Sequence, residues 1–176
     1  MLTGNEENLL AAGAGADPDK GLTALGREAV RRMQRLHIIP DVSHTSDGTF
    51  RDIIRLAEGP VIASHSICRA LGDVRRTLTD DQLRAIRDTG GVVGVNVYHN
   101  FVHADPQQQT AAMLARHAAH IAETIGPEHV ACGFDFCEYF GPGNEGCEGM
   151  ENCAQTGNFF FELERLGFSA AERQGI

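Results

Sequence analysis

The feature that most constrains the fold is a regular alternation of helix-like and strand-like apolar segments. Helical spacing of apolar residues or helix-capping signals predict helices over residues 22–36, 48–57, 79–90, 105–125 and 156–166. Short apolar runs predict strands over residues 38–43, 60–64, 92–97 and 130–136. One helix between successive strands is the spacing of parallel βαβ units, whose strands are buried on both faces. The sequence therefore predicts an α/β fold with parallel strands, either an open doubly wound sheet or a (β/α)8 barrel.

Helix-capping signals sharpen several boundaries. They are Thr79 with Gln82, Asp105 followed by Pro106, and Ser169 with Glu172. The last of these opens a helix that reaches Ile176, the end of the chain, after about two turns. No linker or repeat divides the sequence. We therefore expect residues 1–176 to form one partial domain that is truncated at both ends.

Charge and cysteine content restrict the partners and the compartment. The formal net charge is −9, with 24 acidic and 15 basic side chains, which disfavours nucleic acid or an anionic membrane as a partner. No apolar run approaches the ~20 residues of a membrane-spanning helix. The five cysteines form no C-x-x-C pair and no even framework, which favours a reducing, cytoplasmic location. A loop disulfide between Cys147 and Cys153 is the alternative.

Polar residues that can bind metals follow each predicted strand. His44 and His65 end the first two strands, Asn96 lies at the end of the third, and Asp135 lies in the fourth. The carboxyl ends of parallel strands meet at one edge of the sheet, so these residues can share a site. Imidazole and carboxylate ligands suit Zn²⁺ or another divalent first-row metal. The structural alternative is a hydrogen-bonded polar cap on the strands.

Other polar residues allow two interpretations each. An arginine at 75 or 76 could hold a substrate carboxylate through its planar two-donor fork, or it could be a solvated loop residue. His117 and His120 lie three residues apart on a predicted helix, and we expect packing or a helix face rather than metal binding. His99 and His103 follow the third strand and could line the pocket.

Several motifs, taken in order, resemble those of one family. They are Leu2-Thr3-Gly4-Asn5, Asp41-Val-Ser-His44-Thr-Ser, Pro60-Val-Ile-Ala-Ser-His65-Ser, Arg75-Arg76-Thr-Leu-Thr-Asp, Gly90-Gly91-Val-Val-Gly-Val-Asn96 and Gly133-Phe-Asp135-Phe. Nearly the whole chain is covered, and the sequence resembles the C-terminal half of the membrane dipeptidase (renal dipeptidase) family, peptidase family M19. The resemblance implies part of a (β/α)8 TIM barrel, about strands five to eight with their helices.

The resemblance also implies a function and roles for residues. The family hydrolyses dipeptides with two zinc ions per complete site. His44 and His65 match its metal-binding histidines, and Asp135 matches an aspartate that binds metal and handles the catalytic proton. Arg76 matches the arginine that holds the terminal carboxylate of the substrate. We also expect Asn96 and Phe101 to bind substrate.

The sequence departs from the family pattern in ways that affect this expectation. It has no counterpart of the family's H-x-D pair or of its metal-bridging glutamate. Gly4 stands where the family has a histidine, Thr77 replaces an asparagine and Cys137 replaces an aspartate. We therefore expect at most one zinc ion, little activity from this chain alone, and a homodimer or a missing N-terminal half as partner. The alternatives are a non-catalytic half-barrel that acts as an interaction module, or another amidohydrolase-type metallohydrolase.

Overall fold

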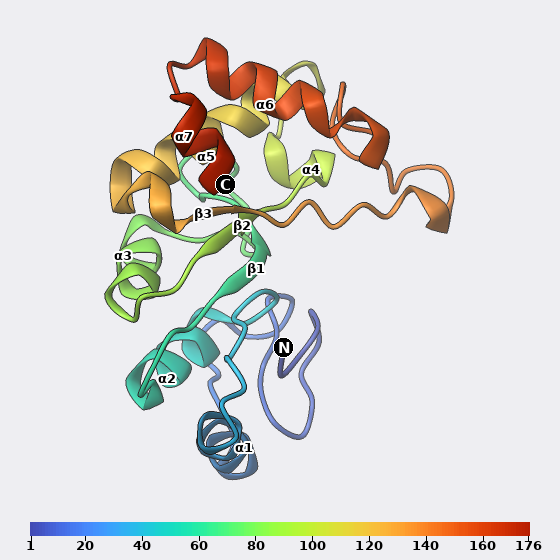
Figure 1. Cartoon of the computed structure of the whole chain (residues 1–176). Helices are drawn as coiled ribbons and strands as arrows, with labels where there is room; N and C mark the ends of the chain where they lie inside the picture. The colour runs from blue at the N-terminus through green and yellow to red at the C-terminus, as the bar shows by residue number, and fades with distance from the viewer.

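The computed structural model describes residues 1–176 as an α/β fold with short parallel strands near its centre (Figure 1). The strands are β1 (Ala63–Ser66), β2 (Val93–Val95) and β3 (Val130–Cys132). The α-helices are α1 (Ala24–Arg35), α2 (Asp47–Leu56), α3 (Asp80–Asp88), α4 (His99–Val102), α5 (Ala111–Ile125), α6 (Thr156–Arg165) and α7 (Ala170–Gly175). Short 3₁₀ helices are η1 (Pro106–Gln108), η2 (Pro127–His129), η3 (Glu138–Phe140) and η4 (Cys153–Gln155).

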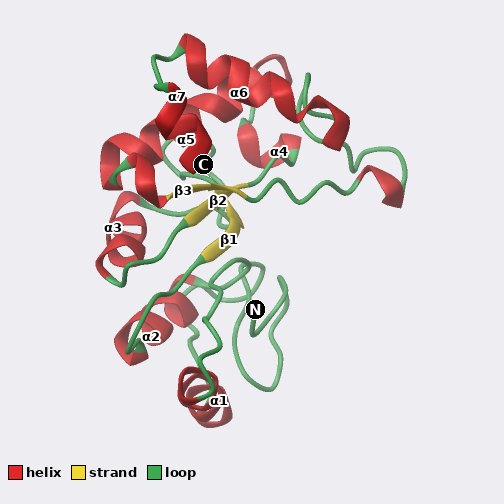
Figure 2. Ribbon diagram, in the orientation of Figure 1, coloured by secondary structure: helices red, strands yellow, loops and turns green.

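The sheet confirms the predicted parallel arrangement. Its order is β1-β2-β3, and Val93 of β2 lies between Ala63 of β1 and Val130 of β3. All three of these residues are buried. Gly94 is required in β2 because a Cβ there would overlap the carbonyl oxygen of Ser64. The strands are short and long loops leave their carboxyl ends (Figure 2), so these loops determine the chemistry at that edge.

The predicted strand over residues 38–43 is wrong. The segment makes only one parallel bridge, between Asp41 and Ile62, with the Val42 N–H donating to the Ile62 carbonyl over 2.8 Å. Pro40 has no N–H for a ladder. The Asp41 side chain accepts from the Ser43 N–H at 3.0 Å, which turns the chain before a second bridge can form. The segment still lies beside β1, so its end reaches the same edge of the sheet.

Two other strand boundaries also differ from the prediction. The strand predicted over 60–64 begins at Ala63 and continues to Ser66. The strand predicted over 130–136 ends at Cys132, although the Phe134 carbonyl still accepts from the Val97 N–H at 2.9 Å. Asp135 has φ 57°, a left-handed conformation that no strand residue adopts. The backbone therefore leaves the sheet at the residue predicted to bind metal.

Capping signals predicted most helix starts correctly. The capping boxes of Thr79 with Gln82 and of Ser169 with Glu172 are both present. The continuous helix predicted over 105–125 is wrong, because Asp105 caps only the short η1. Thr110 then caps α5 by accepting from the Met113 N–H, so a second N-cap within the segment starts the helix anew. The one-turn helix α4 was not predicted.

The helices pack into one continuous apolar core around the strands. Helices α1 and α2 pack together at one end of the molecule, while α5 packs against α6 at the other (Figure 1). Phe159, Leu114 and Ile121 are fully buried where α5 meets α6. All five cysteines are free thiols, so the alternative disulfide between Cys147 and Cys153 does not form. None of the helices is both long and apolar enough to cross a lipid bilayer.

Candidate metal and substrate site

Two histidines meet at the carboxyl edge of the sheet, as predicted. His65 lies in β1, and His44 lies in the loop before α2. Their Nε2 atoms are 2.8 Å apart, and their rings meet edge to face at a centroid distance of 4.9 Å. His44 has φ 69°, and this unusual left-handed backbone occurs where its side chain meets that of His65.

Each imidazole is held through its other nitrogen. The Nδ1 of His44 lies 2.8 Å from Oδ1 of Asn5, and the Nδ1 of His65 lies 2.7 Å from Oγ of Ser64. The Ser64 hydroxyl donates to Asp41 Oδ2 over 2.6 Å, so its oxygen accepts the Nδ1–H of His65. Asn5 Oδ1 is an acceptor and takes the Nδ1–H of His44. Both Nε2 atoms are then left as lone-pair donors, the form in which histidine binds metals.

The local electrostatics keep both imidazoles neutral. Burial and then the nearby positive charge of Arg76 lower the pKa of His44 to about 4. The same two causes, in the same order, lower the pKa of His65. Burial opposes ionisation of Asp41, but hydrogen bonds from Ser64 and Ser43 outweigh it and lower the pKa of that carboxyl. The two neutral Nε2 atoms face each other at 2.8 Å, so their lone pairs repel. A cation bound by both nitrogens would relieve this repulsion. The histidine pair therefore fits a divalent metal.

Asp135 lies next to the histidine pair. Its Oδ2 is 3.8 Å from the Nε2 of His65 and accepts from the Asn96 amide at 3.2 Å. Asn96 is almost fully buried, and its Oδ1 accepts from the Tyr98 N–H at 2.8 Å. Asn96 therefore orients Asp135, and its expected contact with substrate stays a prediction. No group of three or more His, Cys, Asp or Glu side chains in the structure is arranged to hold a metal ion.

Arg76 borders the same site and is buried, so the alternative of a solvated loop residue is wrong for it. Its Nη2 donates to the His65 carbonyl over 2.9 Å, and its guanidinium carbon lies 5.8 Å from the centroid of the Phe101 ring. Burial lowers the pKa of Arg76 to about 10, so the side chain remains positively charged at neutral pH. Its buried Nε–H has no protein acceptor. A charged donor with unused capacity beside the histidines fits a carboxylate ligand.

Most of the remaining histidines make side-chain contacts within the protein. His117 is fully buried between Cys68 Sγ at 2.9 Å and the Val102 carbonyl at 2.8 Å. His120 pairs with Asp80 at 2.8 Å, so both of these helix histidines have partners within the protein. His99 contacts the Glu145 carbonyl and His103 accepts from the Asp105 N–H, and both contacts order loops.

The buried His117 predicts a loss of stability in acid. Burial lowers the pKa of its imidazole from 6.5 to about 4. Between these values only the unfolded state binds the proton, so the free energy of unfolding falls as pH falls, by about 3 kcal/mol in total. His117→Gln should remove about this much of the decrease, measured by urea unfolding at pH 7.5 and pH 4. Equal decreases in the variant and the wild type would contradict the assignment.

Sequence reasoning missed the residues that hold the histidines. Asn5, Asp41 and Ser64 stand inside the quoted motifs, yet nothing in their spacing indicated hydrogen bonds to the histidine rings. Asn5 is 39 residues from His44 in the sequence. A polar residue directly before each strand-end histidine was the only available signal, and it does not identify a partner.

Known proteins are similar to the chain along its whole length. The profile of the membrane dipeptidase family (peptidase family M19) matches residues 1–176. An uncharacterised dipeptidase of Schizosaccharomyces pombe is 33% identical, and the match covers 99% of this chain and 42% of that protein. An uncharacterised protein of Klebsiella pneumoniae is 42% identical over 68% of this chain and 45% of its own length.

A solved structure has a similar fold. The crystal structure of a metallo peptidase from Rhodobacter sphaeroides, bound to a phosphinate mimic of the dipeptide L-Ala-D-Ala, superposes with a TM-score of 0.86 and is 28% identical. The superposition covers 98% of this chain and 50% of that one, so the chain spans about half the length of the relatives it matches. The family implies a metal cofactor, and the histidine pair fits one. From its sequence, fold and site, the chain belongs to the membrane dipeptidase family, peptidase family M19.

Proposed function

We propose that the protein takes part in zinc-dependent hydrolysis of dipeptides that carry a free terminal carboxylate. One observation carries this proposal. The two Nε2 atoms of His44 and His65 converge at 2.8 Å, and the buried, positively charged Arg76 is bonded to the His65 carbonyl beside them. A metal-binding pair next to a carboxylate-binding group is the arrangement that hydrolysis of a short peptide needs.

Each residue of the site has a distinct task in this proposal. His44 and His65 would hold zinc, which when bound would polarise the scissile carbonyl and ease deprotonation of water. Arg76 binds the terminal carboxylate and so sets the distance of the peptide bond from the histidines. Asp135, oriented by Asn96, lies within 3.8 Å of His65 and carries the proton between water and leaving amine. Phe101 forms an apolar wall beside the Arg76 guanidinium.

We further propose that the chain forms about strands five to eight of a (β/α)8 barrel. A second copy or an N-terminal half would complete it and supply the remaining metal ligands. The half-length match to the relatives supports this proposal. The large apolar side chains of Leu36, Ile38 and Ile39 are also exposed. Ile38 and Ile39, with Pro40 and Pro60, line a cavity of about 390 Å³. Light scattering should show a dimer, and a stable monomer would count against the second-copy version.

Five free thiols support a cytoplasmic location.

The first experiment combines metal analysis with a hydrolysis assay. The purified chain is loaded with zinc, its metal content is measured by mass spectrometry, and L-Ala-D-Ala is offered as substrate. That probe is chosen because the Rhodobacter protein binds its phosphinate mimic. One zinc per chain with measurable turnover would support the proposal. Zinc binding without turnover of this or any other dipeptide would contradict completion of the site by a second copy, and failure to bind zinc would contradict the proposal.

A non-catalytic interaction module is the second candidate. It is favoured by the lack of any group of three metal-binding side chains in the chain. This candidate predicts neither zinc retention nor hydrolysis, together with a defined complex in light scattering. The same two measurements therefore separate the candidates. Cyclic amides, tested alongside, would reveal an amidohydrolase instead.

Replacing Arg76 with methionine should raise KM for L-Ala-D-Ala about 100-fold, since a charge-assisted contact is worth about 1.5–3 kcal/mol. Steady-state kinetics measures the change. Arg75→Met is the matched control, because the neighbouring Arg75 is exposed and makes only one long contact, 3.5 Å to the Ala16 carbonyl. The control should keep KM within about twofold, as exposed substitutions usually do. Similar KM values for the Arg76 variant and the wild type would exclude Arg76 from substrate binding.

A further inference from the structure

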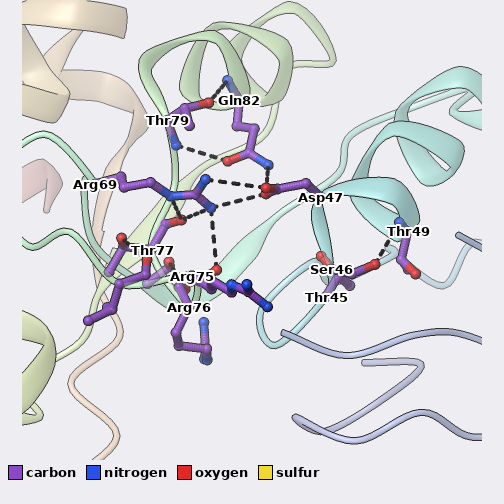
Figure 3. Close-up of polar contacts among 12 residues, drawn as sticks. Thr45, Ser46, Asp47, Thr49, Arg69, Arg75, Arg76, Thr77, Thr79 and Gln82 are labelled. Carbon is purple, nitrogen blue, oxygen red and sulfur yellow. Dashed lines mark hydrogen bonds and ion pairs between the residues drawn. The ribbon is translucent and has the colours of Figure 1, made fainter. Parts of the chain in front are cut away.

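The loop that carries Arg76 is held by a second arginine, Arg69. This loop joins β1 to α3, and Arg69 lies seven residues before Arg76. The Arg69 Nε and Nη2 donate to the Thr77 carbonyl at 3.1 and 2.8 Å, and Nη2 also donates to the Arg75 carbonyl at 3.3 Å. Arg69 therefore donates hydrogen bonds to the main-chain carbonyls directly before and after that of Arg76 (Figure 3).

The other edge of the Arg69 guanidinium binds Asp47, the first residue of α2. Its Nη1 and Nη2 lie 3.3 and 3.0 Å from the two carboxylate oxygens, a paired contact. Gln82 of α3 donates to the same carboxylate over 2.8 Å (Figure 3). Burial opposes ionisation of Asp47, but the hydrogen bonds from Arg69 and Gln82 outweigh it and lower the pKa of the carboxyl. The contact is therefore between full charges at neutral pH.

This contact connects the two halves of the site. Asp47 follows His44 by three residues, and Ser46 between them caps α2. On the other side, the main chain held by Arg69 carries Arg76, whose side chain reaches the His65 carbonyl. Arg69 thus spans from the His44 loop to the Arg76 loop, and it contacts neither histidine ring.

We propose that Arg69 is a positioning residue that, through Asp47 and the Thr77 and Arg75 carbonyls, sets where Arg76 receives the substrate carboxylate. This inference rests on the proposed function, since it assumes that Arg76 binds substrate. This role requires a planar guanidinium whose N–H groups donate to a carboxylate along one edge and to two carbonyls along the other. Lysine, with a single ammonium group, cannot serve both edges.

Kinetics on L-Ala-D-Ala and on its C-terminal amide test the proposal, because the amide has no carboxylate for Arg76. Arg69→Met and Arg69→Lys should each raise KM for the dipeptide about tenfold, a change of about 1.4 kcal/mol, with kcat within twofold. The kcat/KM for the amide should stay within about twofold. Equal losses on both substrates, or an unchanged KM for the dipeptide, would show that Arg69 has no positioning role.

A matched control and a double variant sharpen the result. Arg27→Met removes another ion pair between helices, the 2.8 Å contact of α1 with Asp52 of α2, and KM should not change. Adding Arg69→Met to Arg76→Met should raise KM no further, since the carboxylate contact is already lost. Additive effects of the two substitutions would overturn the proposal.

Hydrogen exchange separates this inference from the proposed function. In the wild type, the Arg69 and Leu78 amides are bonded within the loop, to the carbonyls of Leu78 and Ile67. Arg69→Met should speed exchange about tenfold over residues 69–78 and leave α5 unchanged. If the wild type neither binds zinc nor hydrolyses a dipeptide, the proposed function fails, and hydrogen exchange still tests whether Arg69 positions the loop. Unchanged exchange over residues 69–78 would overturn that part.

Discussion

Replacing His65 with alanine is expected to abolish zinc retention and to lower dipeptide hydrolysis by more than 100-fold. Loss of a residue that merely supports a metal ligand costs roughly 10–100-fold, and His65 is itself one of the two converging imidazoles. His65 is also held by the Asp41–Ser64 hydrogen-bond chain, so no other side chain can replace its ordered Nε2. Mass spectrometry of bound metal and the L-Ala-D-Ala assay measure the two effects.

A second histidine substitution provides the control for this result. His37 is exposed and forms part of the cavity lined by Ile38 and Ile39, away from the histidine pair. It has φ 57°, and asparagine tolerates this left-handed conformation, so His37→Asn should fold normally. We expect unchanged zinc content and turnover in this variant. Full zinc content in the His65 variant would show that His65 is not a metal ligand.

Replacing Phe159 with alanine should lower the free energy of unfolding by about 3–5 kcal/mol, the cost of a large cavity in a core. Phe159 of α6 is fully buried, and its ring packs edge to face on Phe134 with centroids 5.3 Å apart. Phe134 directly precedes Asp135, so the substitution should also loosen the backbone that carries this carboxylate. The protein has no tryptophan, so urea unfolding is followed by circular dichroism.

The same helix offers a matched control for the core substitution. Phe161 lies two residues further along α6 and is 59% exposed. Phe161→Ala should change the free energy of unfolding by less than about 0.5 kcal/mol, because exposed positions rarely contribute more. Equal effects at Phe159 and Phe161 would mean that α6 does not pack on α5 and Phe134 as described.

Features that depend on nearby residues could be predicted from the sequence. The capping boxes at Thr79 and Ser169 act over three residues, and both form as predicted. Alternation of helices and strands predicted a parallel sheet because a helix between strands returns the chain in the same direction. The predicted meeting of His44 and His65 followed from the same rule, since both end neighbouring segments at one edge.

Competing local signals account for the wrong predictions. Apolar residues 38–43 suit a strand, but Pro40 lacks a donor and the Asp41 side chain bonds the Ser43 N–H, so the ladder stops after one bridge. The segment 105–125 holds two N-caps, and the second one, Thr110, decides where α5 begins. In both cases a side chain accepts a hydrogen bond from a nearby backbone N–H. The spacing of apolar residues contains no information about such side-chain hydrogen bonds.

The sequence alone determined the fold class, the family resemblance and the grouping of His44, His65 and Asp135 at one edge of the sheet. Only the tertiary structure decided the state of those groups. Asn5 and the Asp41–Ser64 pair set the imidazole tautomers across 39 and 23 residues. Folding buries the Arg76 guanidinium and so removes it from water. Folding also brings Arg69 to Asp47, from where it holds the loop that carries Arg76. Local patterns act over a few residues, whereas desolvation and hydrogen bonds between distant segments exist only once the chain has folded.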